Sequence, residues 1–103
     1  MIRSTLLAVG LLSHLCAAET LLVPEQYPTI QEAIDAASDG DEVLVSPGTY
    51  TGNNYHSVIN MKGKDVWLRS TDGPEMTIID GENVRRGISC FNGESENCLI
   101  EGF

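Results

Sequence analysis

Residues 23–51 read VPEQYPTIQEAIDAASDGDEVLVSPGTYT, and this stretch decides the fold. Thr29 and Glu32 match the Ser/Thr-x-x-Glu capping box, in which two side chains satisfy backbone N–H groups at a helix start. Apolar residues then follow at the i, i+3, i+4, i+7 spacing of one helix face: Ile30, Ala33, Ile34 and Ala37. Gly40 suits the left-handed position that ends a helix. The pattern predicts a helix of about two turns, which needs a docking surface to persist.

Short apolar strands surround this helix and are separated by turn signals. Val43–Val45 is the first predicted strand, and Pro47-Gly48 ends it. Further strands are predicted at residues 58–59, 66–68, 78–79, 88–90 and 99–100. The turns between them are marked by Lys62-Gly63, Asp72-Gly73, Asp80-Gly81, Asn92-Gly93 and Glu101-Gly102.

The predicted strands recur at a near-constant interval. One series runs Leu44, Trp67, Ser89, with steps of 23 and 22, and a second runs Ile59, Ile79, Ile100, with steps of 20 and 21. A fixed period of about 22 residues is typical of stacked repeats that bury a continuous apolar column. The alternative is an antiparallel sandwich, which favours two-residue hairpin loops and longer alternating strands. Because these strands hold only two or three apolar residues, the sequence favours the solenoid.

Residues 24–50 resemble the N-terminal opening of the right-handed parallel β-helix proteins, the pectin lyase-like superfamily. The matching motifs are YPTIQEAI (27–34), GDEV (40–43) and PGTY (47–50), and TIIDG (77–81) and IEGF (100–103) are similar to its first coils. The resemblance implies an all-β solenoid, a right-handed parallel β-helix with a short N-terminal capping α-helix. It also implies that residues 19–103 are the cap helix and first coils of a truncated domain, since family members carry many more coils.

The resemblance indicates a ligand class better than a reaction. The same opening precedes polysaccharide lyases, pectinesterases, epimerases and non-catalytic surface proteins, and a fold does not fix a function. We therefore expect a secreted or surface protein that interacts with polysaccharide. A full-length enzyme would be similar to a polysaccharide lyase or a pectinesterase, with its catalytic residues on later coils, so this segment alone is expected to be inactive. The alternative is a non-enzymatic extracellular repeat or adhesion protein.

Residues 1–18 have the features of a signal peptide. Arg3 is followed by the apolar run 6–12, and the small residues of Cys16-Ala17-Ala18 predict cleavage after Ala18. The apolar run is too short to span a membrane. We expect an exported protein without a membrane span, located outside the cell, at its surface or in the periplasm.

The charge balance excludes one class of partner. The chain has 15 acidic and 6 basic residues and a net charge of −9, so a nucleic-acid backbone would be repelled. An anionic polysaccharide would need a local basic patch drawn from Lys62, Lys64, Arg69, Arg85 and Arg86. The sequence gives no indication of the oligomeric state.

Few polar residues suggest a catalytic or metal-binding role. Asp80 and Glu101 occupy matching positions before Gly, and the family's lyases bind Ca²⁺ through acidic side chains, but two carboxylates fall short of the six to eight oxygens that Ca²⁺ takes. His56 could act as a general base, although a solvated loop residue without a catalytic role is the simpler interpretation. Arg85-Arg86 could hold a uronate carboxylate or pair locally with acidic neighbours. No motif for a cofactor, a zinc ion or a catalytic triad is present, so no metal or catalytic residue is assigned.

Aromatic and cysteine residues complete the candidates. Tyr50, Tyr55 and Trp67 could stack on sugar rings, and alternation along its strand places Trp67 on the face opposite to its apolar neighbours. Cys90 and Cys98 remain after loss of the leader. In an exported protein they can form a disulfide or remain two separate thiols.

Overall fold

The computed structural model of the chain describes residues 18–52, 56–90 and 92–103. The predicted leader up to residue 17, and Tyr55 among the candidate aromatics, lie outside these residues. The described elements are, in chain order, β1 (Thr20–Val23), α1 (Ile30–Ala36), β2 (Glu42–Val45), β3 (Gly48–Tyr50), β4 (Ser57–Asn60), β5 (Trp67–Ser70), β6 (Thr77–Ile79), β7 (Arg86–Ser89) and β8 (Leu99–Glu101).

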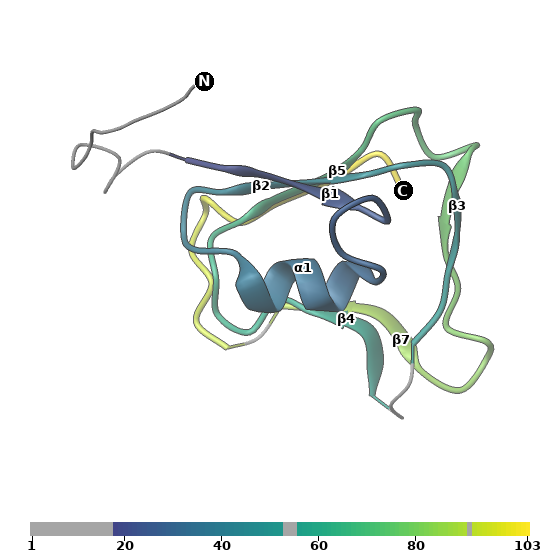
Figure 1. Cartoon of the computed structure of the whole chain (residues 1–103). Coiled ribbons are helices and arrows are strands. Elements are labelled where there is room, and N and C mark those ends of the chain that lie inside the picture. Colours follow the sequence, from purple (N-terminus) through teal and green to yellow (C-terminus); the bar gives the residue numbers. More distant parts are fainter. Residues whose placement is uncertain (1–17, 53–55, 91) are drawn as a thin grey trace, which may run out of the picture.

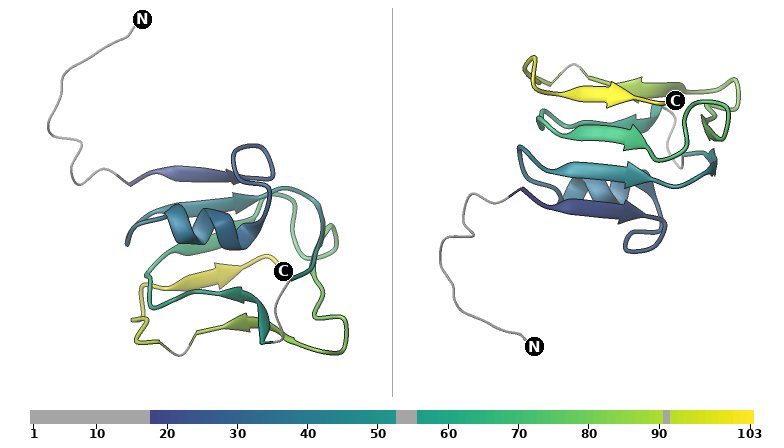
Figure 2. Two further views of the ribbon diagram at one scale, coloured as in Figure 1. Left: turned by 60° about the horizontal axis from the view of Figure 1, so that its bottom comes forward. Right: turned by 90° about the horizontal axis from the view of Figure 1, so that it is seen from above.

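All strand pairs are parallel. Sheet A has four strands in the order β1-β2-β5-β8, and two smaller sheets consist of the pairs β3-β6 and β4-β7 (Figures 1 and 2). Figure 1 shows α1 on the inner side of β1 and β2, facing β4 across the interior. None of the helices in the described part of the chain is long and apolar enough to cross a membrane.

These residues do not form the predicted solenoid, so that prediction was wrong. Residues that pair directly in sheet A are separated by 22, 25 and 32 positions: Thr20–Glu42, Glu42–Trp67 and Trp67–Leu99. A stacked repeat needs a constant interval and about three or more like units. The two smaller sheets have two strands each. The described chain is therefore a small domain of short parallel sheets with one short helix, and not an all-β solenoid of the right-handed parallel β-helix type.

The choice of strand partners also differs from the predicted series. Strand β7 was expected to follow β5, but it pairs with β4, and β5 pairs instead with β8. Strands β1 and β3 were not predicted, because β1 directly follows the leader and β3 was interpreted as an exit turn. Both pair in register, β1 with β2 and β3 with β6.

Helix α1 begins where the sequence predicted it. The Thr29 hydroxyl accepts a hydrogen bond from the Glu32 backbone N–H at 3.1 Å and donates to the Glu32 carboxylate at 3.0 Å. Thr29 is the N-cap residue, so the predicted cap is confirmed. At the other end, the Lys64 ammonium donates to the carbonyl oxygens of Ile34, Asp35 and Ala37 at 2.8–2.9 Å. A cation at this end also complements the negative pole of the helix.

The helix fastens one side of the core. The Gln31 side chain accepts from the Asn60 backbone N–H at 2.7 Å and donates to the Asn60 carbonyl at 3.0 Å, so it holds α1 against β4. The apolar stripe of α1 is buried against sheet A and β4. The core comprises Leu21, Val23, Ile30, Ala33, Ile34, Ala37, Val43, Val45, Val58, Ile59, Met61, Val66 and Leu68.

Candidate functional site

The outer face of sheet A carries the most exposed aromatic side chain in the strands. Val66 and Leu68 are fully buried, whereas Trp67 between them is 38% exposed, so the predicted outward orientation of Trp67 is confirmed. Strand register places Thr20, Glu42, Trp67 and Leu99 in one row across the four strands. The flat backbone of the sheet therefore holds the indole ring at the surface.

Polar contacts fix the Trp67 ring in place. The Arg69 guanidinium lies 4.6 Å from the ring centroid, within the range of a cation–π contact. Arg69 in turn donates to the Glu42 carboxylate, and Thr20 donates to that same carboxylate at 3.3 Å. On β8, the Glu101 carboxylate accepts from the indole N–H at 2.6 Å. These contacts link all four strands and orient the ring before any ligand arrives.

A hollow of about 370 Å³ borders the Trp67 ring at the edge where the strands of sheet A begin. Its other lining residues are polar or small: Asp39, Gly40, Asp41, Asp65 and Asn97. Three of these carry carboxylates, which have no donors to offer and accept hydrogen bonds only. The hollow therefore combines one apolar ring with a set of hydrogen-bond acceptors.

The backbone holds these carboxylates in position. Asp41 accepts from the backbone N–H groups of Glu19 and Ser38 at 3.0 and 2.8 Å, and Asp39 accepts from the Asp65 N–H at 2.9 Å. Asp65 accepts from the N–H and the hydroxyl of Ser95, both at 2.8 Å. The carboxylates are thus pre-oriented; Asp41 is buried and both of its oxygens serve the backbone, whereas Asp39 and Asp65 keep lone pairs for further donors.

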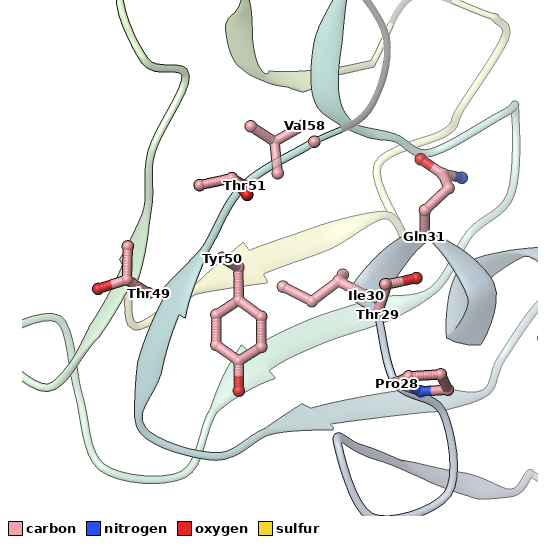
Figure 3. Close-up of a pocket in the computed structure, with 9 residues that line it drawn as sticks. Pro28, Thr29, Ile30, Gln31, Thr49, Tyr50, Thr51 and Val58 are labelled. Carbon is pink, nitrogen blue, oxygen red and sulfur yellow. The ribbon is translucent and has the colours of Figure 1, made fainter.

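A second pocket, of about 360 Å³, lies between the start of α1, β3 and β4 (Figure 3). Tyr50 lines it, but its ring packs on the core and its hydroxyl donates to the Ser46 carbonyl at 2.7 Å. Burial raises the pKa of Tyr50. Thr29 and Gln31 already serve the helix cap and the α1–β4 contact. Because the Tyr50 hydroxyl is hydrogen-bonded and its ring packs on the core, the structure favours a packing role for Tyr50 over the predicted sugar stacking.

The basic candidates are mostly engaged in local contacts. Arg85 pairs with Glu82, as the local alternative predicted, and Lys62 pairs with Asp35 at 2.9 Å. His56 and Arg86 lie beside each other at the start of β4 and β7, where the Arg86 N–H donates to the His56 carbonyl at 2.9 Å. These two line shallow surface hollows. Of the basic candidates, Arg69 contacts the Trp67 ring, and its guanidinium is also bound to Glu42.

The two carboxylates predicted as a possible calcium pair are not brought together. Asp80 follows β6 and accepts from the Glu82 N–H at 2.8 Å, whereas Glu101 lies on β8 in sheet A and binds Trp67. No group of three or more metal-ligating side chains occurs within residues 18–52, 56–90 and 92–103.

No protein-family model, curated protein or solved structure matches the chain. The sequence identified Trp67 and named Arg69 for a possible basic patch, but it did not predict that Arg69 packs on Trp67 or that Glu42 binds Arg69. The available signal was the i, i+2 spacing of Trp67 and Arg69, which puts both on one face of a strand.

Proposed function

We propose that this protein binds polysaccharide through Trp67 and the hollow beside it. The observation that carries the proposal is an exposed, pre-oriented indole ring next to fixed hydrogen-bond acceptors. Sugar rings present apolar C–H faces and hydroxyl donors at their edges. An aromatic wall with a few placed polar groups is the usual composition of a site that orients such a ligand.

The charge of the hollow favours neutral sugars over uronates. The three carboxylates would repel a sugar carboxylate, whereas Asp39 and Asp65 can accept from the hydroxyls of a neutral ring. Two nearby cations are already engaged: the Arg69 guanidinium with Glu42, and the Lys64 ammonium with carbonyl oxygens at the end of α1. The polysaccharide expected from the family resemblance is therefore proposed to be a neutral one, and not the uronate that Arg85-Arg86 could hold.

Two sequence-based expectations support this ligand class. The predicted leader would place the protein outside the cell, where structural polysaccharides occur, and the motifs of residues 24–50 resemble those of carbohydrate-active proteins. The proposed activity is binding, because the described groups form a stacking platform and acceptors. This fits the non-enzymatic extracellular alternative as well as a non-catalytic part of an enzyme.

Fluorescence offers a direct test, because Trp67 is the single tryptophan of the chain. Titration with neutral hexose oligosaccharides should give a saturable change in its emission. Matched oligouronates should bind at least about tenfold more weakly at neutral pH, by the like-charge repulsion in the hollow. Equal or tighter binding of the oligouronates would contradict the neutral specificity.

Variants separate this surface from the rest of the molecule. Trp67→Ala, followed by calorimetry, should weaken binding at least about tenfold, as expected for a central aromatic contact. Asn97→Ala should weaken it several-fold, since Asn97 lines the hollow. Tyr50→Phe is the control in the second pocket and should bind like the wild type. Loss of binding in Tyr50→Phe alone would move the site to the pocket of Figure 3.

A further inference from the structure

The connection from β7 to β8, residues 90–98, lies on the turn that joins β4 to β5. The Gly63 N–H donates to the Glu94 carboxylate at 2.8 Å, and Asp65 binds Ser95. A Cβ built on Gly63 would lie 2.7 Å from the Asn92 carbonyl oxygen, so the two backbones are in close contact there. Residue 91 is outside the described residues. The described residues of the connection, 90 and 92–98, run alongside the turn between β4 and β5.

This arrangement brings the two ends of the connection together. Ser89, the last residue of β7, accepts from the Met61 N–H at 3.0 Å, and Leu99, the first residue of β8, donates to the Val66 carbonyl at 3.2 Å. Met61 and Val66 are the two ends of one turn, which the Lys64 N–H closes by donating to the Met61 carbonyl at 3.1 Å. Positions 90 and 98 therefore sit above the two ends of a closed turn.

Cysteines occupy those two positions. Cys90 is exposed, and Cys98 is half-buried and packs against the core. The Cys90 thiol is among the groups that raise the pKa of Cys98, so the two side chains are near each other at the ends of the connection. The two sulfurs are thus held as neighbours by contacts that do not depend on a covalent bond.

We propose that Cys90 and Cys98 form a disulfide that fastens β8 and the connection before it to the rest of the domain. A disulfide would stabilise this end of the domain because β8 is an edge strand that pairs with β5, and its three residues are all exposed. The contacts that dock the connection are polar and lie at or near the surface, and such contacts are individually weak. A bond between its ends would lower the entropy of the unfolded chain and so stabilise the folded one.

The bond forms by two exchanges with a small-molecule disulfide as the oxidant. The Cys90 thiolate attacks a disulfide such as oxidised glutathione, forms a mixed disulfide and releases one glutathione thiolate. The Cys98 thiolate then attacks the Cys90 sulfur and displaces the second glutathione. The two protein thiols lose two protons and two electrons, and one oxidised glutathione becomes two reduced molecules.

The second exchange should be slow and dependent on pH. Burial raises the pKa of Cys98 to about 11, and the nearby Cys90, Glu94 and Asp65 act in the same direction. The attacking thiolate is therefore a small fraction near neutral pH and grows about tenfold for each pH unit below its pKa. The exposed Cys90 should react first, and closure should accelerate from pH 7 to pH 9.

The test uses the full chain with Cys16→Ser in every sample, so that only two thiols remain. Oxidised glutathione should convert it to a monomer with no alkylatable thiol, about 2 Da lighter by intact mass than the reduced form. Its Tm should rise by at least about 5 °C over the reduced form, and dithiothreitol should reverse the rise. Cys90→Ser and Cys98→Ser, as matched controls, should melt near the reduced protein with or without oxidant.

Three results would overturn the proposal. One is a product that keeps two glutathione adducts or two free thiols after long incubation at pH 9. A second is a disulfide that links two chains instead of Cys90 to Cys98 within one chain. A third is an intrachain disulfide with no change in Tm, since the bond would then not stabilise the fold. None of these readouts involves sugar binding, so they are independent of the proposed function.

Discussion

The two ends of the core are built from similar residues but are covered very differently. Val43, Leu68 and Ile100 form one row on the inner side of sheet A, on β2, β5 and β8. The first two are completely buried, whereas Ile100 is 36% exposed. The strands share one register and one pattern, so the position in the sheet, and not the residue type, sets the burial.

What covers each end explains the difference. At the first end, α1 lays an apolar stripe over the interior and is held by Gln31 and Lys64. At the other end, β8 is the edge strand of sheet A, and the connection before it is held by polar contacts of Glu94 and Ser95. Buried apolar area contributes most of the stability of a small domain, whereas exposed polar contacts contribute little. The end with the helix should therefore be the more stable one.

Truncation of one isoleucine at each end gives the largest expected effect. Ile34→Ala should lower the free energy of unfolding by about 3–4 kcal/mol, because it opens a cavity under α1. Ile100→Ala, the matched change at the exposed end, should lower it by about 1 kcal/mol. Urea denaturation followed by circular dichroism measures both. Equal losses at the two positions would mean that both ends are equally packed.

Removal of the cation at the end of α1 should have an intermediate effect. Lys64→Met keeps the apolar stem but removes the ammonium that donates to the carbonyl oxygens of Ile34, Asp35 and Ala37, of which Ile34 keeps the Ala37 N–H as a donor. We expect a loss of about 1–2 kcal/mol in the free energy of unfolding. Lys62→Met is the control, because its ion pair with Asp35 is about half exposed and should contribute under about 0.5 kcal/mol. A similar loss in both variants would contradict the fastening role of Lys64.

The smallest expected effect concerns the polar end and depends on pH. The backbone hydrogen bond from Gly63 holds the pKa of Glu94 below its ordinary value of 4.5. A carboxylate with a lowered pKa contributes its stabilisation above the ordinary value, and the contribution is lost as the pH falls through the lowered one. Glu94→Gln should therefore melt slightly below the wild type at pH 7 and together with it near pH 3.

Thermal melts of the two proteins from pH 7 to pH 3 check this. A gap in Tm that stays constant over this range would show that the charge of Glu94 is not what docks the connection. A gap that widens toward acid pH would contradict the sign of the shift.

Part of the architecture was predictable because it depends on near neighbours. The capping box at Thr29 and Glu32 fixes the start of α1, since a helix start needs acceptors for its first N–H groups. Alternation likewise predicts that Trp67 faces outward between two buried residues. Each of these signals is contained within a few positions of the chain.

Strand pairing was not predictable in the same way. The sequence suggested one period of about 22 residues, but β7 pairs with β4 and β8 with β5. Partner choice depends on how long each connection is and where its turn reverses the chain. The separation of 32 positions between Trp67 and Leu99 reflects the long connection of residues 90–98. Short apolar runs show where the strands lie along the chain, but not which strands pair or in what register.

The sequence by itself determined the local elements: the helix, its cap, the alternation of Trp67 and the turn glycines. Only the tertiary structure decided which residues became neighbours. It brought Glu101 to the indole of Trp67 across 34 positions, Lys64 to the end of α1, and the Cys90 thiol to that of Cys98. The physical reason is range, because capping and alternation act between adjacent residues, whereas these contacts exist only after strands from distant segments have paired.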